Sequence, residues 1–184
     1  MPAPSSADLD AILERLRDSQ PTYSDVGGTR RETLPDGYVH DRYRVDLPDG
    51  TFERAADGLR RWQAHLGAGV EVHPSGAALR PDTDVVVVAR IGLLHALAPC
   101  RVVYVTDRAD RFGFAYGTLS GHPEQGEEAF VVERAGRAAT FSIVAFSRPA
   151  ALAARLGRPV ARGVQRRVTR AYLDALRHYA TSQH

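Results

Sequence analysis

The spacing of the apolar residues changes along the chain, and this change limits the fold more than any other feature. From Val70 to Phe146 apolar and polar residues alternate with a period of two, which is typical of β-strands. Residues 107–110 and 135–137 are turns of hairpin length, too short for crossover helices, so the strands form an antiparallel sheet. We expect five or six strands here, at about residues 70–74, 83–91, 101–106, 111–118, 127–134 and 138–147.

Helical spacing is found on both sides of this run. Towards the C-terminus, apolar residues recur every three or four positions, at Val160, Val164, Val168, Tyr172, Leu176 and Tyr179. A helix of about 20 residues is roughly 30 Å long, enough to cross an antiparallel sheet. Before the sheet, the same spacing predicts a continuous helix from Thr51 to Leu66, closed by Gly67, and a strand at residues 43–47. The predicted fold class is therefore α+β, a curved antiparallel sheet wrapped around a long C-terminal helix.

The chain is expected to form one domain after a short N-terminal arm. Ser5 can cap a first helix, and Gln20-Pro21 ends it, so residues 1–20 are predicted to be a helical arm. Residues 21–184 are predicted to form a single α+β domain of ordinary size.

Composition excludes several chemistries. All 24 basic residues are arginine, so neither a lysine Schiff base nor a phosphate-loop lysine is possible. Cys100 is the only cysteine, and no two of the seven histidines stand at a helical i, i+4 spacing, so we expect no metal site. Nucleotide-binding glycine motifs are missing from the sequence, and no cofactor is expected. Neither a signal peptide nor a membrane span is recognisable, which predicts a cytoplasmic protein.

Several motifs in a consistent order resemble one family. The segment Phe114 to Glu133, FAYGTLSGHPEQGEEAFVVE, resembles the signature of the uncharacterised family catalogued as domain of unknown function nineteen-ninety. Residues 23–29 resemble its TY-x-x-VG-x-T element, residues 34–38 its LP-x-GY element, and residues 146–149 and 165–172 parts of its C-terminal region. The order of elements also resembles the helix-grip fold of the START-like and Bet v 1-like (SRPBCC-type) superfamily. That resemblance implies a ligand cavity between the sheet and the long helix.

The leading functional hypothesis is a binding domain for a small hydrophobic or amphipathic ligand in that cavity. Its predicted lining residues are Tyr23, Trp62, Tyr104, Tyr116, Thr118, Phe146 and Tyr172. On strand 111–118 one face carries large side chains and the other carries glycine and alanine. The sequence leaves open which of the two faces looks inward, because a shift of one residue reverses them.

Two alternatives remain from the sequence. The first is a cyclase- or hydrolase-like enzyme that uses His122 in the Gly-His-Pro loop with Tyr116 or Thr118 and one glutamate. Glu127 and Glu128 are neighbours on a strand, so they point to opposite faces and at most one can look inward.

The second alternative is an interaction module that uses basic residues near the C-terminus. Residues 148–184 carry a net charge of +7, and arginines recur at helical spacing at Arg155, Arg158, Arg162, Arg166 and Arg170. This arginine stripe would suit an anionic partner. No nucleic-acid-binding motif accompanies it, so a small molecule is the expected partner and nucleic acid is not.

Overall fold

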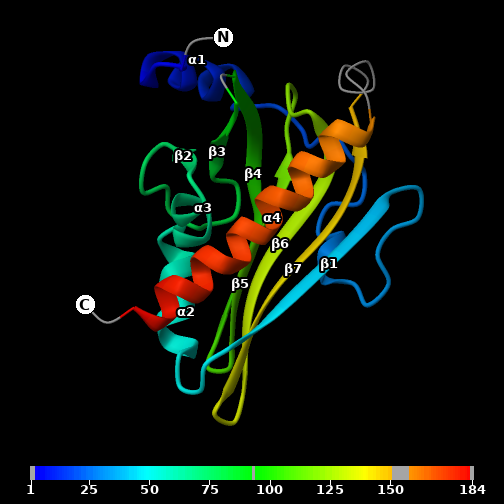
Figure 1. Cartoon of the computed structure of the whole chain (residues 1–184). Helices are drawn as coiled ribbons and strands as arrows, with labels where there is room; N and C mark the ends of the chain where they lie inside the picture. Colours follow the sequence, from blue (N-terminus) through cyan, green and yellow to red (C-terminus); the bar gives the residue numbers. More distant parts are fainter. Residues whose placement is uncertain (1–2, 93, 151–157, 183–184) are drawn as a thin grey trace.

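A computed structural model describes residues 3–92, 94–150 and 158–182. Seven strands form one antiparallel sheet in the order β1-β7-β6-β5-β4-β3-β2, and helix α4 crosses the concave face of this sheet (Figure 1). The predicted architecture, a curved sheet around a long terminal helix, is confirmed. The strands are β1 (Val39–Leu47), β2 (Val70–His73), β3 (Asp84–Ile91), β4 (Leu94–Arg108), β5 (Arg111–Thr118), β6 (Glu124–Ala135) and β7 (Ala138–Pro149). The helices are α1 (Ser6–Leu16), the 3₁₀ turn η1 (Gly28–Arg30), α2 (Phe52–Arg60), α3 (Gln63–Gly67) and α4 (Arg158–Thr181).

Strand β4 begins at Leu94, well before the residue 101 that alternation predicted. This stretch contains Pro99, and proline has no backbone N–H to donate in a central strand. The structure tolerates Pro99 because β5 ends opposite Cys100, so the first part of β4 is paired only with β3. Strand β1 likewise begins at Val39 rather than at residue 43.

The predicted helix from Thr51 to Leu66 is wrong in one respect, because it is broken into α2 and α3 at Trp62. Trp62 has a left-handed backbone (φ 59°), which is uncommon for a residue with a side chain. Its indole is only 2 % exposed and donates a hydrogen bond of 2.8 Å to the Ala77 carbonyl oxygen. Burial of the ring and this bond offset the backbone strain, so Trp62 anchors the two helices to the core.

The main core lies between the concave face of the sheet and the helices. Of the predicted apolar face of α4, Tyr172 and Leu176 are buried in this core and Val168 packs against it. Helices α3 and α4 approach closely, since a Cβ added to Gly67 of α3 would lie 2.9 Å from the Cβ of Ala175 on α4. The side chains of Val160 and Val164 are outside the described residues.

The convex face of the sheet has its own cover. Leu9 of α1 packs on Val86 and Val88 of β3, and residues of the segment 21–38 pack on β6 and β7. Helix α1 and the segment 21–38 therefore lie against the side of the sheet away from α4. Within the described ranges, no helix is both long and apolar enough to cross a membrane.

Candidate functional site

A hydrogen-bonded carboxyl–phenol pair lies on the concave face of the sheet. Strand register aligns Asp41, Ala145, Glu128 and Tyr116 in one row across β1, β7, β6 and β5. Tyr116 belongs to the core on the concave face, so its neighbours in the row share that face. The Tyr116 hydroxyl donates a hydrogen bond of 2.8 Å to Oε2 of Glu128. This pair answers the question left by the sequence: the face of β5 that carries Phe112, Phe114 and Tyr116 is the inner one.

The environment of Glu128 favours its neutral form. Burial raises the pKa of this carboxyl to about 7, the Tyr116 hydrogen bond acts in the opposite direction, and the negative charges of Glu124 and Asp41 raise it further. The side chain is nevertheless only partly buried, so solvent or a ligand can reach it. A carboxyl with these properties is populated in both protonation states near neutral pH, which suits a group that accepts and donates protons.

His65 of α3 continues the polar contact behind Tyr116. Its Nε2 lies 3.2 Å from the Tyr116 hydroxyl oxygen, and its ring packs on Tyr172, 4.5 Å between centroids. Burial lowers the pKa of His65 to about 3, so the ring is neutral. While Glu128 is ionised, the single phenolic hydrogen of Tyr116 points to it, so Nε2 of His65 carries a hydrogen and donates it to the phenol oxygen. Its Nδ1 is then a buried acceptor without a partner among the described residues.

Other groups from separate elements enclose the pair. Burial raises the pKa of the Cys100 thiol on β4 and of the Tyr172 phenol on α4, and the Glu128 charge raises both further. Gln165 of α4 donates a hydrogen bond of 3.1 Å to the Glu124 carboxylate. Glu128 thus contacts Tyr116 of β5 and interacts electrostatically with groups on β1, β4 and α4, so the site combines residues far apart in the chain.

The two ends of the concave face differ sharply in side-chain size. One end is filled by large buried side chains: Trp62, Phe114, Phe130, Phe141, Tyr172 and Leu176. Small inward residues lie in the Glu128 row (Ala145) and in the rows beyond it on β3 and β4 (Ala89, Ala96, Ala98 and Cys100), where Val85 and Val87 are the larger inward residues. Three large apolar residues with inward register lie at strand ends on this side of the Glu128 row and are exposed: Val39 of β1 (37 %), Ile91 of β3 (40 %) and Leu94 of β4 (59 %).

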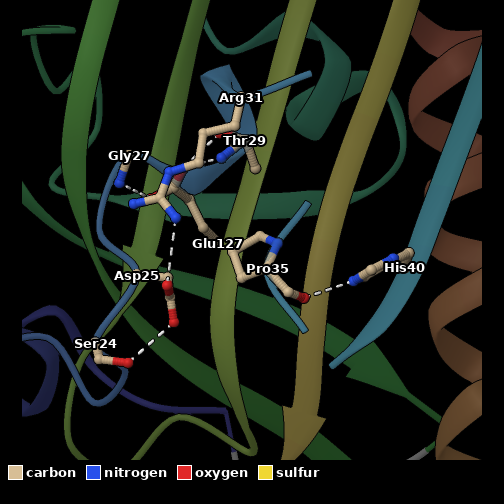
Figure 2. A network of polar contacts seen from close by, with 8 residues as sticks. All are labelled: Ser24, Asp25, Gly27, Thr29, Arg31, Pro35, His40 and Glu127. Carbon is tan, nitrogen blue, oxygen red and sulfur yellow. Dashed lines mark hydrogen bonds and ion pairs between the residues drawn. The ribbon is translucent and has the colours of Figure 1, made fainter. Parts of the chain in front are cut away.

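The neighbouring glutamate, Glu127, lies on the convex face and is fully partnered. Figure 2 shows its carboxylate beneath the segment that contains η1. It accepts hydrogen bonds from the Tyr23 hydroxyl (2.8 Å), from the backbone N–H groups of Gly27 (2.6 Å) and Thr29 (3.0 Å), and from the Thr29 hydroxyl. Tyr104 donates to the Thr29 hydroxyl oxygen (2.7 Å). A carboxylate with all these donors fastens the segment 21–38 to the sheet and has little capacity for a reacting ligand.

The structure separates the predicted lining residues into two groups. Trp62, Tyr116 and Tyr172 meet on the concave side, together with His65, which the sequence analysis did not single out. The others lie elsewhere: Tyr23, Tyr104 and Phe146 pack on the convex side, and Thr118, at the end of β5, bonds the hydroxyl of Thr22 (2.6 Å) and accepts from the backbone of Gly126 (3.0 Å).

The histidine that contacts Tyr116 is His65, and no described contact joins His122 to that pair. His122 Nδ1 accepts a hydrogen bond of 2.9 Å from the backbone N–H of Glu124, which shapes the loop before β6. Burial lowers the pKa of His122 to about 4. In the arginine stripe, Arg166 and Arg170 are exposed on the outer side of α4, and the side chains of Arg155, Arg158 and Arg162 are outside the described residues. Among the residues that can be placed, no three potential metal ligands come together.

Comparison with known proteins supports both the family and the fold. A family model described as domain of unknown function (DUF1990) matches residues 22–175. The UPF0548 protein of Deinococcus radiodurans is 35 % identical over 188 residues, which cover 94 % of each chain. The UPF0548 protein of Dictyostelium discoideum is 26 % identical and covers 88 % of this chain and 86 % of its own.

Solved structures show the fold at much lower sequence identity. A hypothetical protein from Helicobacter pylori superposes with a TM-score of 0.57 at 15 % identity, covering 88 % of this chain and 96 % of that one. Ara h 8.0201, which has a Bet v 1-like fold, superposes with a TM-score of 0.51 at 13 % identity, covering 80 % of this chain and all of that one. These likenesses confirm the predicted helix-grip fold.

Proposed function

The chain belongs to the family of domain of unknown function DUF1990, and we propose that it binds a small amphipathic molecule at the small-residue end of the concave face. The observation that carries this proposal is the asymmetry of that face. Large aromatic side chains occupy one end, whereas Ala145 in the Glu128 row and Ala96 and Ala98 beyond it have small inward side chains, and these alanines would form the floor of the proposed site. Ligand sites in proteins combine apolar walls with a few polar groups that orient the ligand, and this end has both.

The site divides into an apolar and a polar part. Ile91, Leu94 and Val39 expose apolar surface around the rim, which is unfavourable in water unless another molecule covers it. Deeper in, Glu128 and Tyr116 offer a hydrogen-bonding pair. The ligand that fits this arrangement has an apolar body, which rests on the alanine floor, and a hydroxyl or amine group, which donates to Glu128.

This proposal is narrower than the hypothesis drawn from the sequence. The full list of aromatic residues does not line one space, because Tyr23, Tyr104 and Phe146 lie on the other side of the sheet. Trp62 and Tyr172 belong to the filled end, where their rings form the inner wall of the proposed site rather than its floor.

A fluorescent probe tests the proposal directly. 1-Aminoanthracene is neutral and flat, carries one amine donor, and fluoresces more strongly when it leaves water. We expect saturable binding to the wild-type protein and at least a tenfold weaker affinity for Ala98→Leu, because the larger side chain fills the floor. Ala78→Leu is the matched control, since Ala78 is exposed in a loop outside the site, and its affinity should stay within twofold. Equal binding by both variants, or no saturable binding to the wild type, would overturn the proposal.

A further inference from the structure

We infer that this site also transfers protons, with Glu128 as the base and acid that contacts the substrate, Tyr116 as its hydrogen-bond donor and His65 as a positioning residue. The inference rests on the proposed function, because a substrate must first bind on the concave face. It adds a reaction class: removal of a proton from one position of a neutral, largely apolar substrate and its return to another.

Geometry supplies the first argument. The three groups form a continuous chain, His65 Nε2 to Tyr116 Oη (3.2 Å) and Tyr116 Oη to Glu128 Oε2 (2.8 Å). The tyrosine bond uses Oε2, and no residue in the described part of the chain bonds Oε1 of Glu128. One carboxylate oxygen is therefore held and the other is available to a substrate, which is the arrangement that a general base needs.

Electrostatics supplies the second argument. The groups that face Glu128 are Asp41 from β1, Cys100 from β4, Tyr116 from β5, Glu124 from its own strand and Tyr172 from α4. None of these is a cation, so no described neighbour holds Glu128 permanently in its charged form. A carboxylate beside aromatic rings, sulfur and other carboxylates is a stronger base than one in water.

The role of His65 follows from its neutrality and its burial. His65 is completely buried, and its Nδ1 has no partner among the described residues, so the retention of a polar ring at this position needs an explanation. As an Nε2–H donor, His65 prevents the Tyr116 hydroxyl from turning away and directs its hydrogen to Glu128. It acts through Tyr116 and does not touch the substrate.

The proton-transfer step balances without a co-reactant. Oε1 of Glu128 takes a proton from carbon next to an electron-withdrawing group, the C–H bond breaks, and its electron pair stays on the substrate as an enolate-type anion. Glu128 then carries the O–H bond and returns the proton to another atom of the same anion. The net change is an isomerisation, and Glu128 ends as the carboxylate in which it began.

A generic carbon acid tests this inference while the natural substrate is unidentified. In 5-nitrobenzisoxazole, a base removes the proton from C3, the electron pair forms a nitrile, the N–O bond breaks, and a coloured cyanonitrophenolate is released. We expect turnover above the buffer rate that increases as the pH rises through about 7, where Glu128 loses its proton. Glu128→Gln, which keeps the shape but not the basicity, should reduce the rate by about a hundredfold or more.

Variants of Tyr116 and His65 test the proton-transfer role through the pH–rate profile, because loss of a purely structural contact would leave its midpoint unchanged. The Tyr116 hydrogen bond lowers the pKa of Glu128, so Tyr116→Phe should shift the midpoint of the pH–rate profile to higher pH. His65→Phe should shift the midpoint in the same direction by a smaller amount. Glu133→Gln is the matched control, because Glu133 lies on β6 but pairs with Arg111 in solvent, and it should change neither rate nor midpoint.

The outcomes separate the two proposals. If 1-aminoanthracene binds at the site but the wild-type protein shows no turnover, the binding function stands and proton transfer is overturned. Turnover that survives Glu128→Gln also overturns it. If neither the dye nor the carbon acid engages the site, both proposals fail together.

Discussion

Tyr23 and Glu127 are 104 residues apart in the chain, and the Tyr23 hydroxyl donates a hydrogen bond of 2.8 Å to the Glu127 carboxylate. With Gly27 and Thr29, which donate to the same carboxylate, Tyr23 joins the N-terminal segment to the signature segment on β6. The residues that carry the family resemblance in residues 23–29 therefore have a structural explanation. They supply the donors that make a buried carboxylate stable on the convex face.

Loss of the Tyr23 hydroxyl should destabilise the protein. Tyr23→Phe leaves the ring in place but removes one donor from a carboxylate that is 3 % exposed. We expect the free energy of unfolding to fall by about 1–3 kcal/mol, measured by urea denaturation. Tyr43→Phe is the control, because the Tyr43 hydroxyl lies 3.5 Å from Asp41, too far for a strong bond, and a change below about 0.5 kcal/mol is expected. Equal losses in the two variants would contradict the role of Tyr23.

The stability of the protein should depend on pH through Glu128. The folded state raises the pKa of this carboxyl from 4.5 to about 7, so between these values the folded state binds more protons than the unfolded state. Stability is therefore lost as the pH rises through this window. Relative to Glu128→Gln, the wild type should lose on the order of 2–3 kcal/mol between pH 4.5 and pH 8. The measurement is the free energy of unfolding of both proteins across this range, and parallel curves would rule out the raised pKa.

His65 should make the free energy of unfolding depend on pH below about 6.5. Its pKa falls from 6.5 to about 3 on folding, so the unfolded state binds the proton first as the pH decreases. The stability that comes from a neutral His65 is present above pH 6.5 and is lost as the pH falls below it. His65→Phe cannot titrate, so its stability should fall less steeply than that of the wild type from pH 7 to pH 4.5. His122 also has a lowered pKa, but it is present in both proteins and cancels in the comparison.

A matched pair of glycine substitutions tests the packing of the N-terminal segment on β5. A Cβ at Gly117 would lie 2.0 Å from the Tyr23 hydroxyl oxygen, so Gly117→Ala must displace Tyr23 and should destabilise the protein by about 1–3 kcal/mol. At Gly163, on the exposed face of α4, a Cβ would meet nothing within 4 Å. Gly163→Ala should therefore stabilise the helix by about 0.5–1 kcal/mol. The measurement is the melting temperature of the two variants, which should fall for Gly117→Ala and rise for Gly163→Ala. Shifts of the same sign would contradict the close packing of Tyr23 on Gly117.

Much of the fold could be predicted because periodicity reports which side of an element is buried. Alternation was sufficient for the strands from β3 to β7, and the spacing of Tyr172 and Leu176 was sufficient for the buried side of α4. The ends of strands and the break at Trp62 could not be predicted, because they depend on tertiary partners. The left-handed backbone of Trp62 is favourable only when the Ala77 carbonyl is present to accept the indole N–H.

The candidate site could be predicted only in part. Tyr116 and the two glutamates belong to one recognisable segment, and their alternation indicates that one glutamate faces inward. Which one does so depends on the register of β6, which the sequence leaves open. His65 was missed because its partner is 51 residues away in the chain. The available signal was its position three residues after Trp62, on the same side of the predicted helix.

The adjacency of Glu127 and Glu128 has a consequence for the register in which the strands of this sheet pair. One of these neighbours requires the donors of the N-terminal segment, and the other requires a phenol beneath the long helix. A shift of β6 by one residue in one direction would place Glu127 beside Tyr116 and leave the donors of Tyr23, Gly27 and Thr29 without an acceptor. A shift in the other direction would place Glu128 beside those donors and leave Tyr116 opposite Ala129. The Glu127-Glu128 pair therefore favours one register of β6, because only one pairing of β5, β6 and β7 satisfies both carboxylates. The carboxylate of the proposed site and the carboxylate that fastens the N-terminal segment therefore fix the register of the sheet together.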